Sequence, residues 1–296
     1  MFVSTEIFSW RGIGSDEKTI KLLQESGFSA YDYSMFAGNG NENLGYELLE
    51  SDNYIEKAKA LRAYADSIGM PCNQTHAPFP TAKKGNEEFN KQAKVRTIRA
   101  IEISGILGAK YCVVHPCNDY TPEENAQMYK EFIQTAKKAG VKIATENMWN
   151  CVGWGTPEFR ATPAACSSHE NFKRHMELLT ALDKDVFGAC VDIGHAEMKG
   201  LETSAVQMLE TLGEYVTCIH LHDVDLVNDN HHLPFICNID YAPIIKAFKK
   251  IGYKGDITLE SGTFSRRLPV ELLPAGAKYA SAVAYYFKEK LSKVDE

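Results

Sequence analysis

The feature that most constrains this chain is a regular recurrence of short apolar runs. Eight runs rich in β-branched or aromatic residues begin about 25 to 45 residues apart, and a stretch with helical spacing of apolar residues follows each one. The runs are residues 2–8, 28–36, 71–79, 111–116, 142–148, 187–195, 216–223 and 256–262. Strands that alternate with helices form parallel sheets, because each helix returns the chain to the same end of the sheet. Eight such units predict an α/β fold, a single (β/α)8 TIM barrel domain over residues 1–296.

Local signals mark where the helices begin and end. Ser15 and Thr121 each precede acidic residues, and Pro122 follows Thr121, which is typical of a helix start. Glycines stand just before several of the predicted strands, where helices commonly end: Gly27, Gly69, Gly140 and Gly252.

Three connections are longer than the usual 2–6 residues of such loops. They are residues 37–49, 149–166 and 224–240, and each follows a predicted strand. The C-terminal ends of barrel strands are where active sites are built. Trp149, Trp154, Phe159 and Arg160 therefore predict a loop that packs over a substrate.

The composition narrows the class of protein. Acidic residues outnumber basic ones by 39 to 32, a net charge of −7, which argues against a nucleic-acid partner because phosphate binding needs basic residues. No apolar run reaches the ~20 residues of a membrane span, so no membrane association is expected. The eight cysteines form no CxxC pair and no secretory signal is seen, which predicts a cytoplasmic protein.

Ionisable residues recur at the ends of the last six runs. Taken alone, a histidine at a strand end is more often a hydrogen-bonded core residue than a ligand, but six consecutive strands deliver such groups to one end of the barrel. These residues are His76, His115, Glu146, Asp192 with His195, His220 with His222 and Asp223, and Glu260.

Three carboxylates, from Glu146, Asp192 and Glu260, are predicted to converge. Converging carboxylates repel one another unless a cation lies between them, so a divalent metal is favoured over a network of polar groups without metal. Three oxygen ligands and one imidazole suit Mn²⁺ best, and Mg²⁺, Co²⁺ and Zn²⁺ are also compatible.

At these residues the sequence resembles the xylose isomerase-like barrel superfamily, in particular its sugar phosphate isomerase/epimerase branch, which is related to endonuclease IV. The segments that carry the resemblance, in order, are Thr75-His76-Ala77-Pro78-Phe79, Val113-Val114-His115-Pro116, Thr145-Glu146-Asn147, Cys190-Val191-Asp192-Ile193-Gly194-His195-Ala196, Ile219-His220-Leu221-His222-Asp223, Asp229-Asn230-His231, Asn238-Ile239-Asp240-Tyr241 and Leu259-Glu260.

The resemblance implies roles for individual residues. One metal would be held by Glu146, Asp192, Glu260 and a histidine, for which His220 is preferred to His222. Glu146 and Glu260 would also be the catalytic pair. Substrate contacts are expected from His76, His115, His195, His222, Trp149 and Arg160, and Asp229 and His231 match additional metal ligands of the endonuclease IV-like relatives.

The implied activity is metal-dependent isomerisation or epimerisation of a small sugar or keto-polyol, through proton abstraction and an enediolate. The same groups would serve a lyase or dehydratase acting on a keto sugar or cyclitol. A metal-dependent phosphodiesterase resembling endonuclease IV and a non-catalytic sugar-binding barrel are the further alternatives. The resemblance is compatible with a homo-oligomer.

Overall fold

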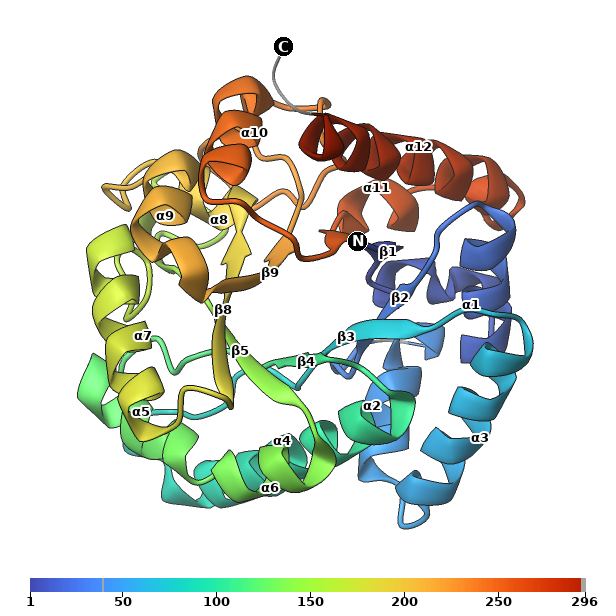
Figure 1. Ribbon diagram of the computed structural model, residues 1–296, viewed down its shortest axis with the longest axis horizontal. Helices are drawn as coiled ribbons and strands as arrows, with labels where there is room; N and C mark the ends of the chain where they lie inside the picture. Colours follow the sequence, from blue (N-terminus) through green and yellow to red (C-terminus); the bar gives the residue numbers. More distant parts are fainter. Residues whose placement is uncertain (39, 294–296) are drawn as a thin grey trace.

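The strands close into a barrel, as the sequence predicts (Figure 1). The computed structural model describes residues 1–38 and 40–293. Within these residues, parallel pairing runs in the order β2, β3, β4, β5, β8, β9, and β1 pairs with β10. Single parallel bridges, Glu6 to Asp32 and Leu221 to Leu259, join the two groups into a ring. The barrel strands are β1 (Val3–Thr5), β2 (Tyr31–Ser34), β3 (Cys72–His76), β4 (Tyr111–Val113), β5 (Lys142–Glu146), β8 (Phe187–Asp192), β9 (Val216–His220) and β10 (Ile257–Leu259).

Helices surround the strands in Figure 1. They are α1 (Asp16–Glu25), α2 (Leu44–Glu50), α3 (Tyr54–Ser67), α4 (Glu87–Leu107), α5 (Pro122–Lys130), α6 (Ile133–Ala139), α7 (His169–Leu182), α8 (Ile193–Glu197), α9 (Ala205–Leu212), α10 (Tyr241–Lys250), α11 (Gly262–Arg266) and α12 (Leu273–Ser292). Short 3-10 helices lie at Phe8–Ile13, Gly40–Asn43, Gly213–Tyr215 and Val270–Leu272.

The predicted helix boundaries are confirmed. The Ser15 side chain accepts the Lys18 backbone N–H at the start of α1, and Thr121 and Glu124 form a reciprocal capping box at the start of α5. The four predicted terminal glycines have φ between 66° and 96°, the left-handed backbone that ends a helix without a steric penalty.

The apolar core lies mainly between the strands and the helices. Outward-facing strand residues such as Ile143, Val191 and Ile257 are fully buried there, and each such side chain contributes about 1.5–3 kcal/mol of burial free energy. A separate small cluster of Val113, Ala144, Cys190 and Cys218 is also buried. Its residues lie on β4, β5, β8 and β9, four of the strands whose ends carry the ionisable groups.

The three long connections follow β2, β5 and β9, but not all of them are loops. Residues 37–49, predicted as a loop, include most of α2, and Asn39 lies outside the described residues. Residues 149–166 contain an antiparallel hairpin of β6 (Asn150–Val152) and β7 (Arg160–Thr162). The connection 224–240 is irregular and is held by Asp223, which accepts the backbone N–H groups of Cys237 and Ile239.

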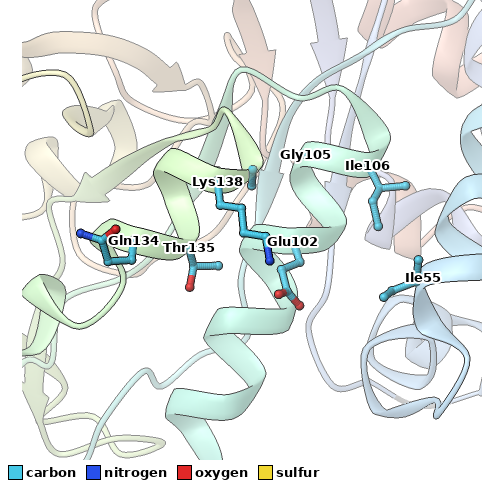
Figure 2. Close-up of a pocket in the computed structure, with 8 residues that line it drawn as sticks. Ile55, Glu102, Gly105, Ile106, Gln134, Thr135 and Lys138 are labelled. Carbon is cyan, nitrogen blue, oxygen red and sulfur yellow. The ribbon is translucent and has the colours of Figure 1, made fainter.

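A groove of about 510 Å³ lies on the outside of the barrel, between α3, α4 and α6 (Figure 2). Ile55 and Ile106 give it an apolar side, and the Lys138 side chain extends toward Glu102 in Figure 2. None of the predicted site residues line this groove. In the part of the chain that the structure describes, no helix has the length and apolar character to cross a bilayer.

Candidate active site

Four predicted metal ligands meet at the C-terminal end of the barrel. Glu146, Asp192 and His220 are the last residues of β5, β8 and β9, and Glu260 directly follows β10. Each offers one ligand atom, and these atoms lie within 4.8 Å of one another. His220 Nδ1 is 3.2 Å from Glu146 Oε2, 3.0 Å from Glu260 Oε2 and 3.9 Å from Asp192 Oδ2. The carboxylates therefore surround a single imidazole nitrogen.

The charges of this cluster are strongly coupled. Burial alone would raise the pKa of Glu146 and Glu260, but the nearby imidazoles outweigh burial and hold both values well below the ordinary range. Burial would lower the pKa of His220, yet Glu146 and Glu260 raise it well above its ordinary value. The cluster thus favours ionised carboxylates with a cationic group between them.

Several buried atoms of the cluster have no hydrogen-bond partner. Glu146 Oε2 and His220 Nδ1 approach each other without hydrogen-bond geometry, and His76 Nε2 is also unpartnered. Buried polar atoms without partners cost about 1–3 kcal/mol each, so a ligand that binds these atoms would offset that cost. Three carboxylates and an imidazole are a suitable donor set for Mn²⁺ or a related divalent cation, and these residues fit one.

A second ligand cluster adjoins the first. His195, His222, Asp229 and His231 each place an atom within 4.8 Å of the others. Asp229 Oδ2 is 3.3 Å from His195 Nε2 and 3.0 Å from His231 Nε2. Burial would raise the pKa of Asp229, but His231 and His195 hold it well below its ordinary value, and Asp229 raises the pKa of His231 to about 10 against the effect of burial.

Backbone carbonyls orient two histidines of the second cluster. His195 Nδ1 donates to the carbonyl of Asn147, and His231 Nδ1 donates to the carbonyl of Glu260, both at 2.9 Å. Because a carbonyl only accepts, these bonds place the Nδ1 protons and turn Nε2 of each ring toward Asp229. His231 has φ 45°, a strained backbone for a non-glycine residue that is typical of functional positions.

His222 links the two clusters. Its Nε2 donates to Asp192 at 2.8 Å from Oδ1 and 3.0 Å from Oδ2, and its ring stacks on His231 at 4.1 Å. His220, not His222, therefore lies in the first cluster with Glu146, Asp192 and Glu260. The close approach of the His222 ring to α8 depends on Gly194, which has no side chain to occupy that space.

His76 and His115 adjoin the first cluster. His115 Nε2 is 3.4 Å from Glu146 Oε2, and His76 Nε2 is 3.9 Å from Glu260 Oε2. Aromatic rings border them: Phe36 is 5.3 Å from the His76 ring and Phe79 is 5.1 Å from the His115 ring. These rings give the mouth of the barrel an apolar side.

The hairpin residues lie farther out. The Trp149 ring is 6.4 Å from the His195 ring, and Trp154 stacks on Trp149 while remaining 73% exposed. Arg160 lies on β7 with its side chain exposed. Of the predicted substrate contacts, His195 and His222 lie within the second cluster, and His76, His115 and Trp149 lie beside the clusters. Arg160 is on the outer part of the hairpin.

Comparison with known proteins agrees with this architecture. A family model described as "Xylose isomerase-like TIM barrel" matches residues 20–288. The chain belongs to this xylose isomerase-like TIM barrel family. Among curated relatives, the uncharacterized protein MJ1311 of Methanocaldococcus jannaschii is 29% identical over 203 residues, and the match spans 63% of each protein. The uncharacterized protein y4fM of Sinorhizobium fredii is 22% identical over 268 residues, 82% of this chain and 80% of that protein.

Solved structures share the fold of this xylose isomerase-like barrel at low identity. A D-tagatose 3-epimerase-like protein superposes with a TM-score of 0.71 at 22% identity, covering 98% of both chains. A D-psicose 3-epimerase has a TM-score of 0.71 at 13% identity, covering 99% of this chain and 100% of its own. The IolI protein, solved with a bound zinc atom, also has a TM-score of 0.71, at 17% identity with 97% and 99% coverage.

Three buried polar residues of this xylose isomerase-like barrel were not predicted from the sequence. Glu6 follows β1, Asp32 lies in β2 and Gln74 lies in β3, each at most 3% exposed. Burial raises the pKa of Glu6 to about 7. With Glu6 and Asp32 included, every barrel strand delivers an ionisable side chain toward the C-terminal end. The available signal was an acidic residue inside each of the first two apolar runs.

Proposed function

We propose that this protein is a divalent-cation-dependent isomerase or epimerase of a small sugar or keto-polyol. One observation carries the proposal: Glu146 and Glu260 face the same His220 nitrogen from different strands, at 3.2 and 3.0 Å. Paired carboxylates of this kind hold a cation and also accept and return protons. The epimerases that share the fold support this choice of substrate class.

Glu146, Asp192, His220 and Glu260 would hold the cation. When bound, the cation supplies Lewis-acid stabilisation of the negative charge that develops on a substrate oxygen. We expect Mn²⁺, with Mg²⁺, Co²⁺ or Zn²⁺ as alternatives.

In the proposed reaction, carboxylate side chains of the protein transfer the protons. One carboxylate of the Glu146–Glu260 pair would remove the proton next to the substrate carbonyl, and the other would return a proton from the opposite direction, which inverts the carbon. His195 and His115 would contact substrate hydroxyls. Phe36 and Phe79 would exclude water from one side of the reacting carbon.

Elimination from a keto sugar or cyclitol begins with the same proton abstraction. A lyase or dehydratase would differ in what leaves after the proton, and therefore in its product. Product analysis distinguishes the two: an epimer retains the mass of its substrate, whereas a dehydration product is lighter by one water.

Phosphodiester hydrolysis is the second candidate, and the second cluster favours it. His195, His222, Asp229 and His231 would hold a further cation beside the first, and catalysis by neighbouring metal ions is typical of phosphoryl transfer. The net charge of −7 is unfavourable for binding a polyanionic duplex.

The test is a panel of ketoses and aldoses incubated with the Mn²⁺-loaded protein in D₂O, with deuterium uptake at carbon followed by NMR. We expect uptake by one substrate class and about one tightly bound divalent cation per chain. Cleavage of an abasic-site duplex, with three tightly held zinc ions and no deuterium uptake by any sugar, would instead support the phosphodiesterase.

A further inference from the structure

Asn147, the residue that follows Glu146 at the end of β5, takes no part in the proposed reaction. Its side chain is buried, and both ends of the amide bind one residue of the neighbouring strand β8. The Oδ1 atom accepts the backbone N–H of Asp192 at 2.8 Å, and Nδ2 donates to the backbone carbonyl of Asp192 at 2.9 Å. The amide therefore holds the backbone of a proposed cation ligand at two points.

The pairing of β5 with β8 does not supply these two bonds. That pairing ends with Glu146 opposite Cys190, so Asp192 lies two residues beyond it. A side-chain amide carries the same kinds of donor and acceptor as a backbone peptide group. Asn147 thus takes the place of the β5 backbone that would otherwise hold the end of β8.

The carboxylate of Asp192 is held as well as its backbone. Its Oδ1 accepts the backbone N–H of His195 at 2.7 Å and the Nε2–H of His222 at 2.8 Å. The other oxygen, Oδ2, is 3.9 Å from His220 Nδ1, the nitrogen that Glu146 also faces. Because these bonds restrain the side chain, a shift of the Asp192 backbone would move Oδ2 away from the other ligand atoms.

We propose that Asn147 is a positioning residue that sets the affinity of the cation site by fixing Asp192 relative to Glu146. It adjoins Glu146 along the chain and binds Asp192 through its amide, so one residue sets the spacing of two ligands on different strands. Removing a group that holds a metal ligand in place typically weakens metal binding about 10–100-fold. The inference rests on the proposed cation dependence and extends it to a residue outside the set of ligands.

The experiment measures Mn²⁺ binding by calorimetry on the full chain after treatment with a chelator. Asn147→Ala removes both bonds to Asp192 without changing any charge. We expect this variant to bind Mn²⁺ about 10–100-fold more weakly than the wild-type protein. The Co²⁺-loaded protein gives a second readout, because the visible spectrum of this ion depends on the arrangement of its ligands. We expect the spectrum of Asn147→Ala to differ from that of the wild type.

Asn125→Ala is the matched control, because Asn125 makes the same pair of bonds elsewhere in the barrel. Asn125 is fully buried on α5; its Oδ1 accepts the backbone N–H of Cys117 at 2.9 Å, and its Nδ2 donates to the Cys117 carbonyl at 3.1 Å. Cys117 belongs to neither of the two ligand clusters. This variant should lose stability in urea, as Asn147→Ala does, but keep the wild-type Mn²⁺ affinity and Co²⁺ spectrum.

The outcomes separate this inference from the proposed function. A wild-type protein that binds neither cation refutes both, whereas weakened binding in Asn147→Ala alone supports the inference whichever substrate the protein takes. Wild-type Mn²⁺ affinity in Asn147→Ala, or equal weakening in Asn147→Ala and Asn125→Ala, overturns the positioning role. If Asn147→Ala does not fold, Asn147→Ser decides, because its shorter side chain cannot reproduce the amide: weakened binding supports the inference and unchanged binding overturns it.

Discussion

Replacing Gly194 with alanine should disturb the link between the two ligand clusters. A Cβ atom at Gly194 would lie 2.1 Å from Cε1, 2.4 Å from Nε2 and 2.5 Å from Nδ1 of His222. Ordinary contact begins near 3.4 Å, so the fully buried ring must move by about 1 Å or more. His231 already stacks on one face of that ring at 4.1 Å. The Nε2 edge, which donates to Asp192, is the part that the new methyl group displaces.

The cost follows from these contacts. Overpacking a core costs about 1–3 kcal/mol, and losing a hydrogen bond to a carboxylate costs about 1.5–3 kcal/mol. Alanine regains less than about 1 kcal/mol through its higher helix propensity. We therefore expect Gly194→Ala to lower the free energy of unfolding by about 1.5–6 kcal/mol, and Mn²⁺ affinity to fall about 10–100-fold because Asp192 loses its imidazole partner.

Urea unfolding and Mn²⁺ calorimetry measure the two effects separately. Gly12→Ala is a suitable control, because the nearest atom to its new Cβ, Leu273 Cδ1, lies at an ordinary 3.6 Å. Gly194→Ala with the urea midpoint and the Mn²⁺ affinity of the wild type would show that His222 is not held as argued.

Three other expectations concern separate parts of the molecule. Glu260→Gln should reduce turnover about 10²–10⁴-fold without unfolding the protein by circular dichroism, and full activity on the true substrate would rule out the two-carboxylate scheme. Burial lowers the pKa of His175 from 6.5 to about 4, so the unfolded chain takes up this proton first as the pH falls. Stability should decrease between pH 6.5 and 4 by up to about 3 kcal/mol, and His175→Gln should flatten that part of the urea midpoint plotted against pH; parallel curves would contradict this. Trp154→Ala should raise the KM for the sugar about 2–10-fold while the free energy of unfolding changes by about 1 kcal/mol or less, and an unchanged KM would mean that the hairpin does not contact substrate.

The barrel was predictable because its signals are local. Each of the eight apolar runs contains one observed barrel strand, and the caps at Ser15 and Thr121 lie where the sequence placed them. The helix α2 was not predictable from residues 37–49, whose Gly- and Asn-rich composition favours a loop. Its start is held by a distant residue instead: the buried Arg11 donates to the carbonyls of Ser34 and Glu42.

The site was predictable where an ionisable residue stands near the end of a run and inside a segment that carries the family resemblance, as Glu146 and His220 do. Glu6 stands equally near the end of its run and Asp32 lies in the middle of its run, but neither belongs to a segment that carries the resemblance, so both were missed. Alternation along a strand distinguishes its two faces, but both faces of a barrel strand are buried. The sequence therefore could not indicate that these carboxylates are buried at the end of the barrel that carries the clusters. The left-handed backbone of His231 and of Phe235, at φ 45° and 74°, was not predictable either, because neither residue is a glycine.

Protons and cations compete for the same atoms in this site. The carboxylates of Glu146 and Glu260 raise the pKa of His220, so without a metal the cluster favours a proton on the imidazole between them. A cation can bind His220 Nδ1 only through the lone pair that this proton occupies, so binding must release the proton. Cation affinity should consequently strengthen as the pH rises. The carboxylates that attract the metal thus also stabilise the imidazolium of His220, which takes the place of the cation when no metal is bound. A positive charge is therefore present among the buried acids in either state, which explains how so many of them can coexist at one end of a barrel.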